Sequence, residues 1–434
     1  MAPVKNNSND YVTRVTASPL EIDAQTWNAL LDQQDDATPF MRHEYLAAMH
    51  ESGSAAPSTG WKACFVTLWV GEELHAACAL YLKDHSYGEY VFDWAWANAY
   101  EQHGLAYYPK ALVAAPFTPV PGARLLATSD AARVALLRAV LAWCRQKKLS
   151  SVHLLFIADQ EVAACAAAGL MLRHTVQFHW RNAASALALA PAPSPSSEAG
   201  MTADPSKIGP CGKSRYTSFE EFLAGLSQEK RKKIRQERRK VAQAGVTFRS
   251  LRGAEIGAAE WDFFYRCYER TYLEHGNAPY LKRDFFRRMA RDMPANWLLF
   301  IAEREGQPIA TSLIALNDRP MESASCFDAK QTEKVAYGRY WGALQRVDSL
   351  HFEACYYQPL QWCIEHGFDR FEGGAQGEHK MARALMPVKT FSAHWLAHPA
   401  FADAVERFLE REGEGIDNYL DHLQERSPFR RGET

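Results

Sequence analysis

The stretch with the strongest chemical character lies late in the chain, at residues 371–380, which read FEGGAQGEHK. Three glycines within five positions allow tight turns and let a ligand approach the backbone closely. The charged side chains around them can move a proton or anchor an anion. We therefore predict a site here, or alternatively a tight strand-to-helix turn with solvated charges. The candidate catalytic residues are Glu372, Glu378 and His379, and the candidate cofactor- or donor-binding residues are Gly373, Gly374, Gly377 and Lys380.

A strongly basic run lies at residues 229–240, which read EKRKKIRQERRK and contain eight Lys or Arg residues. The run has good helix formers and no helix breaker before Gly245, so we predict a helix. Such a helix is either a solvated connection or a surface that contacts phosphates of a nucleotide cofactor or an RNA backbone. For the second case the candidate donor-binding residues are Lys230, Arg231 and Lys233.

Residues 93–119 combine aromatic side chains and prolines with aspartate and lysine. Clustered Trp and Tyr beside charged groups can line a cleft for a polar acceptor. The alternative is an elaborated loop that packs over a sheet. The candidate substrate-binding residues are Asp93, Trp94, Trp96, Tyr107, Tyr108 and Lys110.

The elements that must position these residues occur twice in the chain. Residues 38–50 (TPFMRHEYLAAMH) are matched by residues 278–290 (APYLKRDFFRRMA), and further pairs follow in the same order. Among them, Trp143-Cys144 is matched by Trp362-Cys363, and His179-Trp180 by His394-Trp395. A colinear duplication explains this order, so we infer two copies, roughly residues 20–184 and 246–397.

Each copy shows the same succession of hydrophobic patterns. An amphipathic helix precedes two or three strands, which begin at residues 63–68 and 298–302. A longer helix follows at 131–147 and 352–366, then a strand at 152–157 and 368–371, a short helix and a last strand that ends in His-Trp. The predicted fold class is therefore α/β (α+β), with two tandem domains, each a mixed sheet flanked by helices.

The predicted domains are residues 1–184, a connecting segment 185–245 and residues 246–434, the last with a C-terminal helix near 401–411. The connection starts with an Ala/Pro/Ser-rich loop (184–213), whose composition cannot pack a core. Cys211-Gly-Lys-Ser214 is not a phosphate-binding Walker loop, because Lys207 stands where that motif needs glycine.

The amino-acid composition and the absence of certain motifs argue against several classes of protein. The 434 residues carry a net charge of -2, which argues against a polycation built for nucleic acid, and the 12% aromatic content argues against extensive disorder. No apolar run is long enough for a membrane helix and the N-terminus has no signal-peptide character, so we expect a cytoplasmic protein without a membrane span. Cysteine and histidine show no metal-ligand spacing, so no metal is expected. Hydrolase G-x-S-x-G and dinucleotide G-x-G-x-x-G motifs are also absent from the sequence.

The duplicated unit resembles the acyl-CoA N-acyltransferase (GNAT) fold, and tandem units with a basic helical connection resemble Fem-type peptidoglycan aminoacyltransferases. The similarity is closest to a bacterial Fem-like family of peptidoglycan biosynthesis/recognition N-acyltransferases, and it covers about residues 30–183 and 215–400. The stretches that carry it are TPFMRHEY (38–45), FDWAW (92–96), YYPK (107–110), PFTP (116–119), KRKKIR (230–235) and EGGAQGEHK (372–380).

The resemblance implies transfer of an acyl or aminoacyl group to an amine of a small molecule or peptide, such as a peptidoglycan-related acceptor. No cofactor would be bound permanently. The donor is acyl-CoA in ordinary GNAT enzymes and aminoacyl-tRNA in Fem-type enzymes, which would make tRNA a partner. The chain lacks the usual acetyl-CoA loop, to which residues 337–342 (YGRYWG) are the nearest approach. Two alternatives remain: a catalytically inactive GNAT-fold protein that binds nucleotide, cell-wall precursor or RNA, and a plain nucleic-acid binder, which the net charge disfavours.

Overall fold

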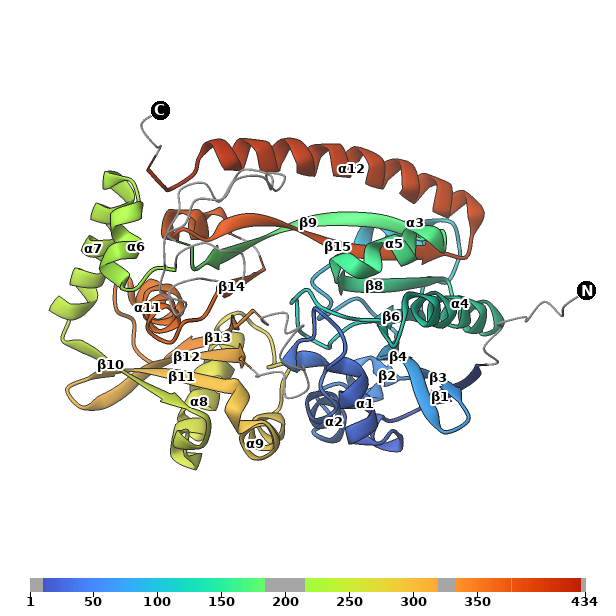
Figure 1. Cartoon of the computed structure of the whole chain (residues 1–434), viewed down its shortest axis with the longest axis horizontal. Helices are drawn as coiled ribbons and strands as arrows, with labels where there is room; N and C mark the ends of the chain where they lie inside the picture. Colours follow the sequence, from blue (N-terminus) through green and yellow to red (C-terminus); the bar gives the residue numbers. More distant parts are fainter. Residues whose placement is uncertain (1–10, 184–214, 319–332, 376, 431–434) are drawn as a thin grey trace, which may run out of the picture. The chain divides into compact units, whose positions relative to one another are not determined.

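The computed structural model describes residues 11–183, 215–318, 333–375 and 377–430 (Figure 1). The Ala/Pro/Ser-rich loop, the Cys-Gly-Lys-Ser sequence and Gln376 of the glycine-rich stretch lie outside the described residues.

The chain divides into two compact units, and each unit draws on both repeats. Unit 1 comprises residues 1–175, 280–292 and 389–418, and unit 2 comprises residues 176–279, 293–388 and 419–434. The domain boundaries predicted from the sequence, after residues 184 and 245, stay a prediction. The compact units are a different division of the chain, because each consists of three separate segments.

Unit 1 contains two sheets. The smaller has the order β1-β3-β4-β7, and the larger runs β2-β5-β6-β8-β15. Among the described strands of this larger sheet, β6 and β8 are parallel and the other pairs are antiparallel. Its strands are β1 (Val12–Thr16), β2 (Trp61–Ala63), β3 (Phe65–Val70), β4 (Glu73–Cys78), β5 (Leu80–Lys83), β6 (Lys110–Val113), β7 (Leu126–Ala127), β8 (Ser151–Ile157) and most of β15 (Met386–Leu396). Its helices are α1 (Ala24–Leu31), α2 (His43–Glu51), α3 (Trp94–Gln102), α4 (Asp130–Gln146), α5 (Asp159–Ala167), α9 (Arg283–Asp292) and most of α12 (Pro399–Glu425).

In its described residues, unit 2 has a sheet with the order β10-β11-β12-β13-β14-β9, in which β13 and β14 are parallel and the other neighbours are antiparallel. The strands are β10 (Val246–Arg252), β11 (Trp297–Arg304), β12 (Gln307–Asn317), β13 (Val335–Ala343), β14 (Arg370–Ala375) and the end of β9 (Met171–Arg181). The helices are α6 (Phe219–Gly225), α7 (Gln228–Gln243), α8 (Ala258–Glu274), α10 (Leu350–Phe352), a π-helical turn (Glu353–Tyr357), α11 (Gln358–Glu365) and the 3-10 helix η8 (Glu378–Arg383).

The two repeats exchange their last strands. In unit 1, β15 of the second repeat pairs antiparallel with β8 of the first, so that His394 lies opposite His153. In unit 2, the end of β9 from the first repeat pairs with β14 of the second, so that His179 lies opposite Glu372. The larger sheet of unit 1 and the sheet of unit 2 each therefore contain a strand from the other repeat.

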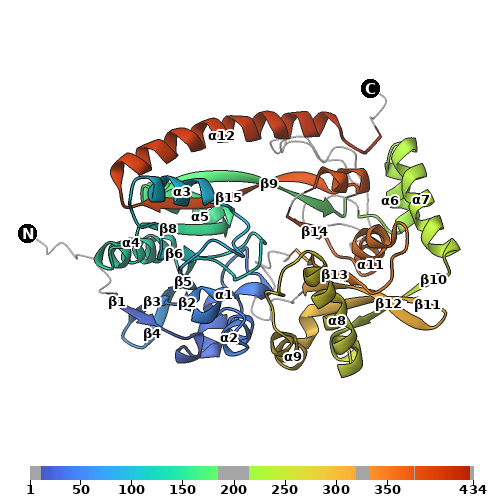
Figure 2. The ribbon, with the colours of Figure 1, turned by 180° about the vertical axis from the view of Figure 1, so that it is seen from behind.

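Several predicted elements are confirmed. The helix predicted over 131–147 is α4, and the basic run forms α7, which lies beside α6 within unit 2 (Figure 2). The helix predicted at 352–366 exists but is interrupted by the π-helical turn, and the C-terminal helix is much longer than predicted. None of the helices in the described ranges combines the length and apolarity that a membrane crossing needs.

The structure corrects the prediction around the glycines. The strand predicted at 368–371 runs to Ala375, so Gly373 and Gly374 lie inside β14 and not after it. A helical segment does follow, but it is the six-residue 3-10 helix η8. A 3-10 segment this short turns more tightly than an α-helix, which changes the directions in which its side chains point.

Candidate active site

The glycine-rich stretch of unit 2 lies where two parallel strands stop pairing. β13 and β14 pair from Val335 with Arg370 to Tyr337 with Glu372, and the pairing ends there. The ladder between β14 and β9 is also irregular, with a register shift between Glu372 and Ala375. Gly373 and Gly374 therefore have backbone groups outside the regular ladder, which is where a ligand can reach them.

The structure explains why both of these positions in β14 are glycine. A Cβ on Gly373 would lie 2.4 Å from Cδ2 of Leu385, and Gly374 has a φ of +79°, which other residues adopt only with strain. The backbone here is thus both tightly packed and sharply turned. A side chain at position 373 would displace the Leu385 side chain, and one at position 374 would strain the backbone.

Glu372 is the carboxylate closest to this irregularity. It is 3% exposed, and its Oε1 lies 3.4 Å from Nε of Arg370. Its Oε2 lies 3.7 Å from Nε2 of His179, beyond hydrogen-bond distance, and accepts no hydrogen bond. Burial raises the pKa of the Glu372 carboxyl to about 7, although Arg370 acts in the opposite direction. A carboxyl group with this pKa can both take up and release a proton near neutral pH.

Lys380 of η8 points inward, toward the same strand. It is 3% exposed, and its Nζ donates a hydrogen bond of 2.8 Å to the carbonyl of Gly374. Burial lowers the pKa of the Lys380 ammonium to about 8. The structure therefore places Lys380 against Gly373 and Gly374, and Glu372 directly precedes these glycines on β14.

The other predicted residues of this stretch lie apart from that group. Glu378 is exposed and accepts hydrogen bonds from Tyr419 (2.7 Å) and Arg426 (3.0 Å), and the Tyr419 hydrogen bond lowers the pKa of the Glu378 carboxyl. His379 is also exposed, with its Nε2 3.4 Å from the hydroxyl of Tyr356. Gly377, with a φ of +110°, makes the turn into η8.

Sequence reasoning missed a buried ion pair that ties η8 to the basic helix. Arg383 is 2% exposed, donates to Glu237 of α7 at 2.9 Å, and its guanidinium lies 3.6 Å above the ring centre of Phe352. Tyr357 also donates to Glu237. The sequence did contain a signal for the burial of Glu237. This residue lies on the same face of α7 as Ile234 and Val241, which are both buried.

The predicted donor-binding residues of α7 lie on the rest of its surface. Lys233 is exposed, and Lys230 and Arg231 are half-buried. Lys230 pairs with its neighbour Glu229 at 3.1 Å.

In unit 1, most of the predicted substrate-binding residues form one buried network. Lys110 is fully buried and donates to Asp93, to Glu89 (2.8 Å) and to Ser86 (2.8 Å). Tyr107 donates to Asp93 at 2.6 Å. Glu89 and Ser86 were not predicted, because nothing in their local spacing distinguishes them from loop residues.

The two carboxyl groups of this network, Asp93 and Glu89, have pKa values that are shifted in opposite directions. Burial acts to raise the pKa of Asp93, but Lys110 outweighs it and holds that pKa well below its ordinary value. Burial raises the pKa of Glu89 to about 7. One oxygen of each carboxylate, Oδ1 of Asp93 and Oε1 of Glu89, is buried and accepts no hydrogen bond. The network therefore has acceptor capacity left for a ligand with N–H or O–H groups.

The remaining aromatic residues of the predicted set differ in exposure. Trp96 is buried and packs edge-on against His394 at 5.1 Å. The Tyr108 hydroxyl lies 2.8 Å from Ser86 Oγ. Trp94 is 37% exposed and packs against the exposed ring of Tyr87, with a centroid distance of 5.0 Å.

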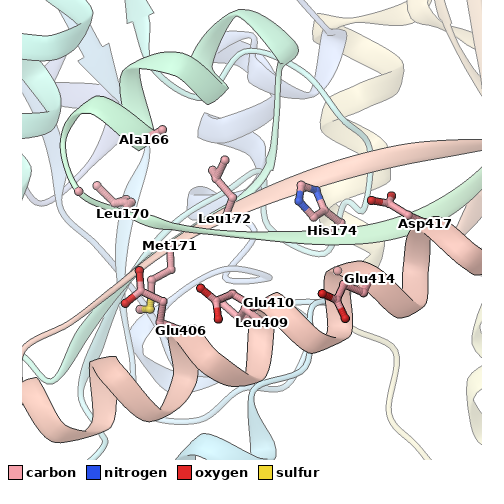
Figure 3. A pocket seen from close by; sticks show the side chains of 12 residues that line it. Ala166, Leu170, Met171, Leu172, His174, Glu406, Leu409, Glu410, Glu414 and Asp417 are labelled. Atoms are coloured by element: carbon pink, nitrogen blue, oxygen red, sulfur yellow. The ribbon is translucent and has the colours of Figure 1, made fainter.

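A separate groove of about 630 Å³ opens in unit 1 between the start of β9 and α12 (Figure 3). None of the predicted site residues lines it. Its α12 side carries four carboxylates, at Glu406, Glu410, Glu414 and Asp417, so it would repel a phosphate-bearing donor.

A family model described as FemAB-like, peptidoglycan biosynthesis/recognition, matches residues 18–187 and 212–431, which is most of the chain. The chain belongs to this family. It is therefore an acyltransferase of a family that acts in peptidoglycan biosynthesis and recognition. The predicted α/β (α+β) fold class, with mixed sheets flanked by helices, is confirmed.

Solved structures of similar fold have low sequence identity. One is the C-terminal domain of a putative lysylphosphatidylglycerol synthetase from Agrobacterium fabrum, with 10% identity, 89% of this chain and 96% of that chain covered, and a TM-score of 0.49. FemX has 9% identity, 89% and 98% coverage and a TM-score of 0.49. A tandem GNAT protein from the clavulanic acid biosynthesis pathway has 10% identity, 90% and 99% coverage and a TM-score of 0.43. No curated protein matches the sequence significantly.

The two repeats of this FemAB-like enzyme differ at the position of Glu372. Counted from the shared Trp-Cys pair, the residue equivalent to Glu372 in the first repeat is His153. Nδ1 of His153 lies 2.8 Å from Nδ1 of His394, and burial lowers the pKa of His153 to about 3. A neutral, hydrogen-bonded histidine thus replaces the carboxylate in unit 1, and of these two positions only the one in unit 2 carries a group that can titrate near neutral pH.

Proposed function

We propose that this FemAB-like enzyme transfers an aminoacyl group from aminoacyl-tRNA to an amine of a peptidoglycan-related acceptor, with Glu372 as the proton acceptor. The observation that carries the proposal is the buried Glu372 carboxyl, which has a pKa of about 7 and directly precedes the two glycines of β14. Lys380 points inward to the carbonyl of Gly374 on the same strand. A general base works best when its pKa is close to the working pH.

In the proposed reaction, the acceptor amine attacks the carbonyl carbon of the aminoacyl ester and passes one proton to Glu372. The oxyanion that forms is stabilised by backbone N–H groups near Gly373 and by the Lys380 ammonium. The ester C–O bond then breaks, and the departing tRNA hydroxyl takes the proton back from Glu372. The products are an amide and a free tRNA, and the enzyme returns to its initial protonation state.

The basic helix supports aminoacyl-tRNA over acyl-CoA as the donor. Within the described part of the chain, no ion pair neutralises Arg231, Lys233 or Arg239. Phosphate backbones bind to such rows of free cations, and the affinity then falls steeply with salt. The sequence also lacks the usual acetyl-CoA loop.

In unit 1, we assign the acceptor to the network around Lys110. The free oxygens of Asp93 and Glu89 can accept N–H or O–H groups, and the exposed rings of Trp94 and Tyr87 offer apolar contact beside them. Glu378 and His379 are proposed to contact the donor from the exposed side of η8.

The donor assignment is tested by binding purified protein to an aminoacyl-tRNA pool, with acetyl-CoA and longer acyl-CoAs as competitors. We expect saturable binding that requires the aminoacyl group. Replacing Lys230, Arg231 and Lys233 together by Ala should weaken it and flatten its salt dependence, by roughly 0.7–0.9 in log–log slope for each phosphate that is no longer neutralised. The matched control, Lys62, Lys147 and Lys148 to Ala, removes three exposed charges from unit 1 and should leave binding unchanged. Displacement by an acyl-CoA would instead make acyl-CoA the donor.

The role of Glu372 is tested by single-turnover transfer with Glu372→Gln. We expect the rate to fall by about 10²-fold or more with little loss of donor affinity. In the unmodified enzyme the rate should rise with pH through about 7, because only the ionised carboxylate accepts a proton. An unchanged rate in Glu372→Gln would remove this residue from the mechanism.

A further inference from the structure

The groove of unit 1 runs along one edge of β9. Its lining on this side includes Leu170, Met171 and Leu172, and its opposite wall is α12 (Figure 3). Successive side chains of a strand point to opposite faces of the sheet, so consecutive lining residues place the groove at the strand's edge and not over one face. None of the described residues of β15, which neighbours β9 on one side, lines the groove. The groove therefore follows the other edge of β9.

That edge of β9 has no strand beside it over its first residues, within the part of the chain that the structure describes. The sheet order places β9 between β14 and β15, but β14 pairs with β9 only from Gln177 to Arg181. Residues 171–175 therefore turn their outer N–H and C=O groups toward the groove. An open strand edge of this kind is where an extended peptide can add as a further strand.

The opposite wall of the groove carries a row of carboxylates. Glu406, Glu410 and Glu414 are exposed and follow one another at every fourth position of α12. Among the described residues none of the three takes part in an ion pair, whereas Asp417, the fourth carboxylate of the groove, pairs with Lys389 at 2.5 Å. Like charges four residues apart on a helix repel one another. This wall therefore has negative charge that a cationic ligand would balance.

The rest of the lining supplies no opposing charge. The described residues that line the groove include neither Lys nor Arg. His174 lines it, but burial lowers the pKa of its imidazole, which is therefore neutral at pH 7. Leu170 and Leu172 lie two residues apart, so they share one face of the strand, and Met171 lies on the other. The groove thus has a charged wall, an apolar wall and a strand edge between them.

The spacing of the carboxylates matches that of an extended peptide. A helix rises about 1.5 Å per residue, so carboxylates four residues apart are separated by about 6 Å along α12. Side chains on the same face of an extended strand recur every two residues, or about 6.8 Å. Three alternate residues of a five-residue peptide therefore reach all three carboxylates, and the five residues match the length of the open edge of β9.

We propose that this groove binds an extended cationic segment of a partner protein, about five residues long with Lys or Arg at alternate positions, as a further strand beside β9. The backbone of the segment pairs with residues 171–175. Its basic side chains meet Glu406, Glu410 and Glu414, and its intervening side chains pack beside Leu172. The site shares no residue with the donor and acceptor groups proposed above, so it stands or falls independently of the proposed function.

A dye-labelled peptide, Lys-Val-Lys-Val-Lys with blocked ends, tests the charge requirement by fluorescence anisotropy. We expect saturable binding at one site per chain that weakens as salt is added. Changing Glu406, Glu410 and Glu414 together to Gln should weaken binding about tenfold, through the loss of three exposed ion pairs. The matched control changes three exposed carboxylates of α12 that do not line the groove, namely Asp403, Asp421 and Glu425. An equal loss in the control would show unspecific attraction and overturn the proposal.

A single cation added to the rim tests the position of the site. Ala166 of α5 is exposed and lines the groove, whereas Ala163 of the same helix is exposed and does not. Ala166→Lys should weaken binding of the cationic peptide, and Ala163→Lys should leave it unchanged. Equal binding by the two variants would place the peptide elsewhere on the chain.

N-methylated peptides test the pairing with β9. Alternate N–H groups of an extended strand point to the same edge, so methylation of the odd-numbered or of the even-numbered residues blocks one edge each. We expect one of the two peptides to lose binding and the other to retain it, and equal effects would overturn strand addition. Spermine that binds at least as tightly as the peptide would make the groove a polyamine site. Self-association of the chain alone in sedimentation, abolished in the triple Gln variant, would make the occupant a second copy. Either result would overturn the assignment to a partner segment.

Discussion

Replacing Glu372 by Gln should stabilise unit 2 at alkaline pH. The ordinary pKa of a Glu carboxyl is 4.5, and burial raises that of Glu372 to about 7 in the folded chain. Since the folded state binds this proton more tightly than the unfolded state, stability falls as the pH rises between these two values. Each pH unit in this window costs about 1.4 kcal/mol, so the ionised Glu372 costs about 3 kcal/mol above pH 7. Gln has no proton to lose and avoids this cost.

Urea unfolding at a series of pH values measures the effect. The difference in unfolding free energy between Glu372→Gln and the unmodified chain should grow by up to about 3 kcal/mol in favour of the variant between about pH 5 and pH 8. Glu378→Gln is the matched control, and its effect on the unfolding free energy should have the opposite sign. Tyr419 and Arg426 stabilise the charged form of Glu378, so its loss should destabilise the chain at neutral pH and matter less in acid. A difference for Glu372→Gln that does not change with pH, or that follows the control, would refute the reasoning.

Arg383→Met should destabilise unit 2 by about 3–5 kcal/mol in urea unfolding, because Glu237 would stay buried without its guanidinium partner. Arg235→Met, which removes an exposed ion pair, should cost under about 1 kcal/mol, and equal losses in the two variants would contradict the importance of burial. Lys110→Met leaves the carboxylates of Asp93 and Glu89 without their shared counter-ion, so the melting temperature should fall further as the pH rises and Glu89 ionises. A loss that is constant with pH would show that Lys110 contributes packing and not charge.

The sequence predicted the parts of this fold that depend on local pattern. Apolar spacing identified α4 and α7 correctly, and the Trp-Cys and His-Trp pairs revealed the duplication. The boundaries of β14 were wrong, because glycine is disfavoured in strands, whereas β14 continues past Gly373 and Gly374 to Ala375, which pairs with Gln177 of β9. The interruption before α11 by a π-helical turn also left no mark in the hydrophobic periodicity.

The sequence indicated the stretch that holds the candidate site, but it did not show which of the ionisable residues in this stretch are buried. The stretch 372–380 contains three ionisable residues in a row, Glu378, His379 and Lys380, and local spacing treats them alike. The 3-10 geometry of η8 turns Lys380 inward and leaves the other two exposed. Arg383 and Glu237, which hold η8 against α7, are far apart in the chain, so their pairing has no local signature.

The sequence by itself determined the duplication, the fold class, the basic helix and the stretch in which we propose the active site, because periodicity and residue type are local properties. Only the tertiary structure decided that the repeats exchange their last strands and that Glu372, not Glu378, is the buried carboxylate. The reason is that burial, hydrogen bonding and pKa depend on neighbours from remote segments. For Glu372 these neighbours include His179, which comes from the other repeat.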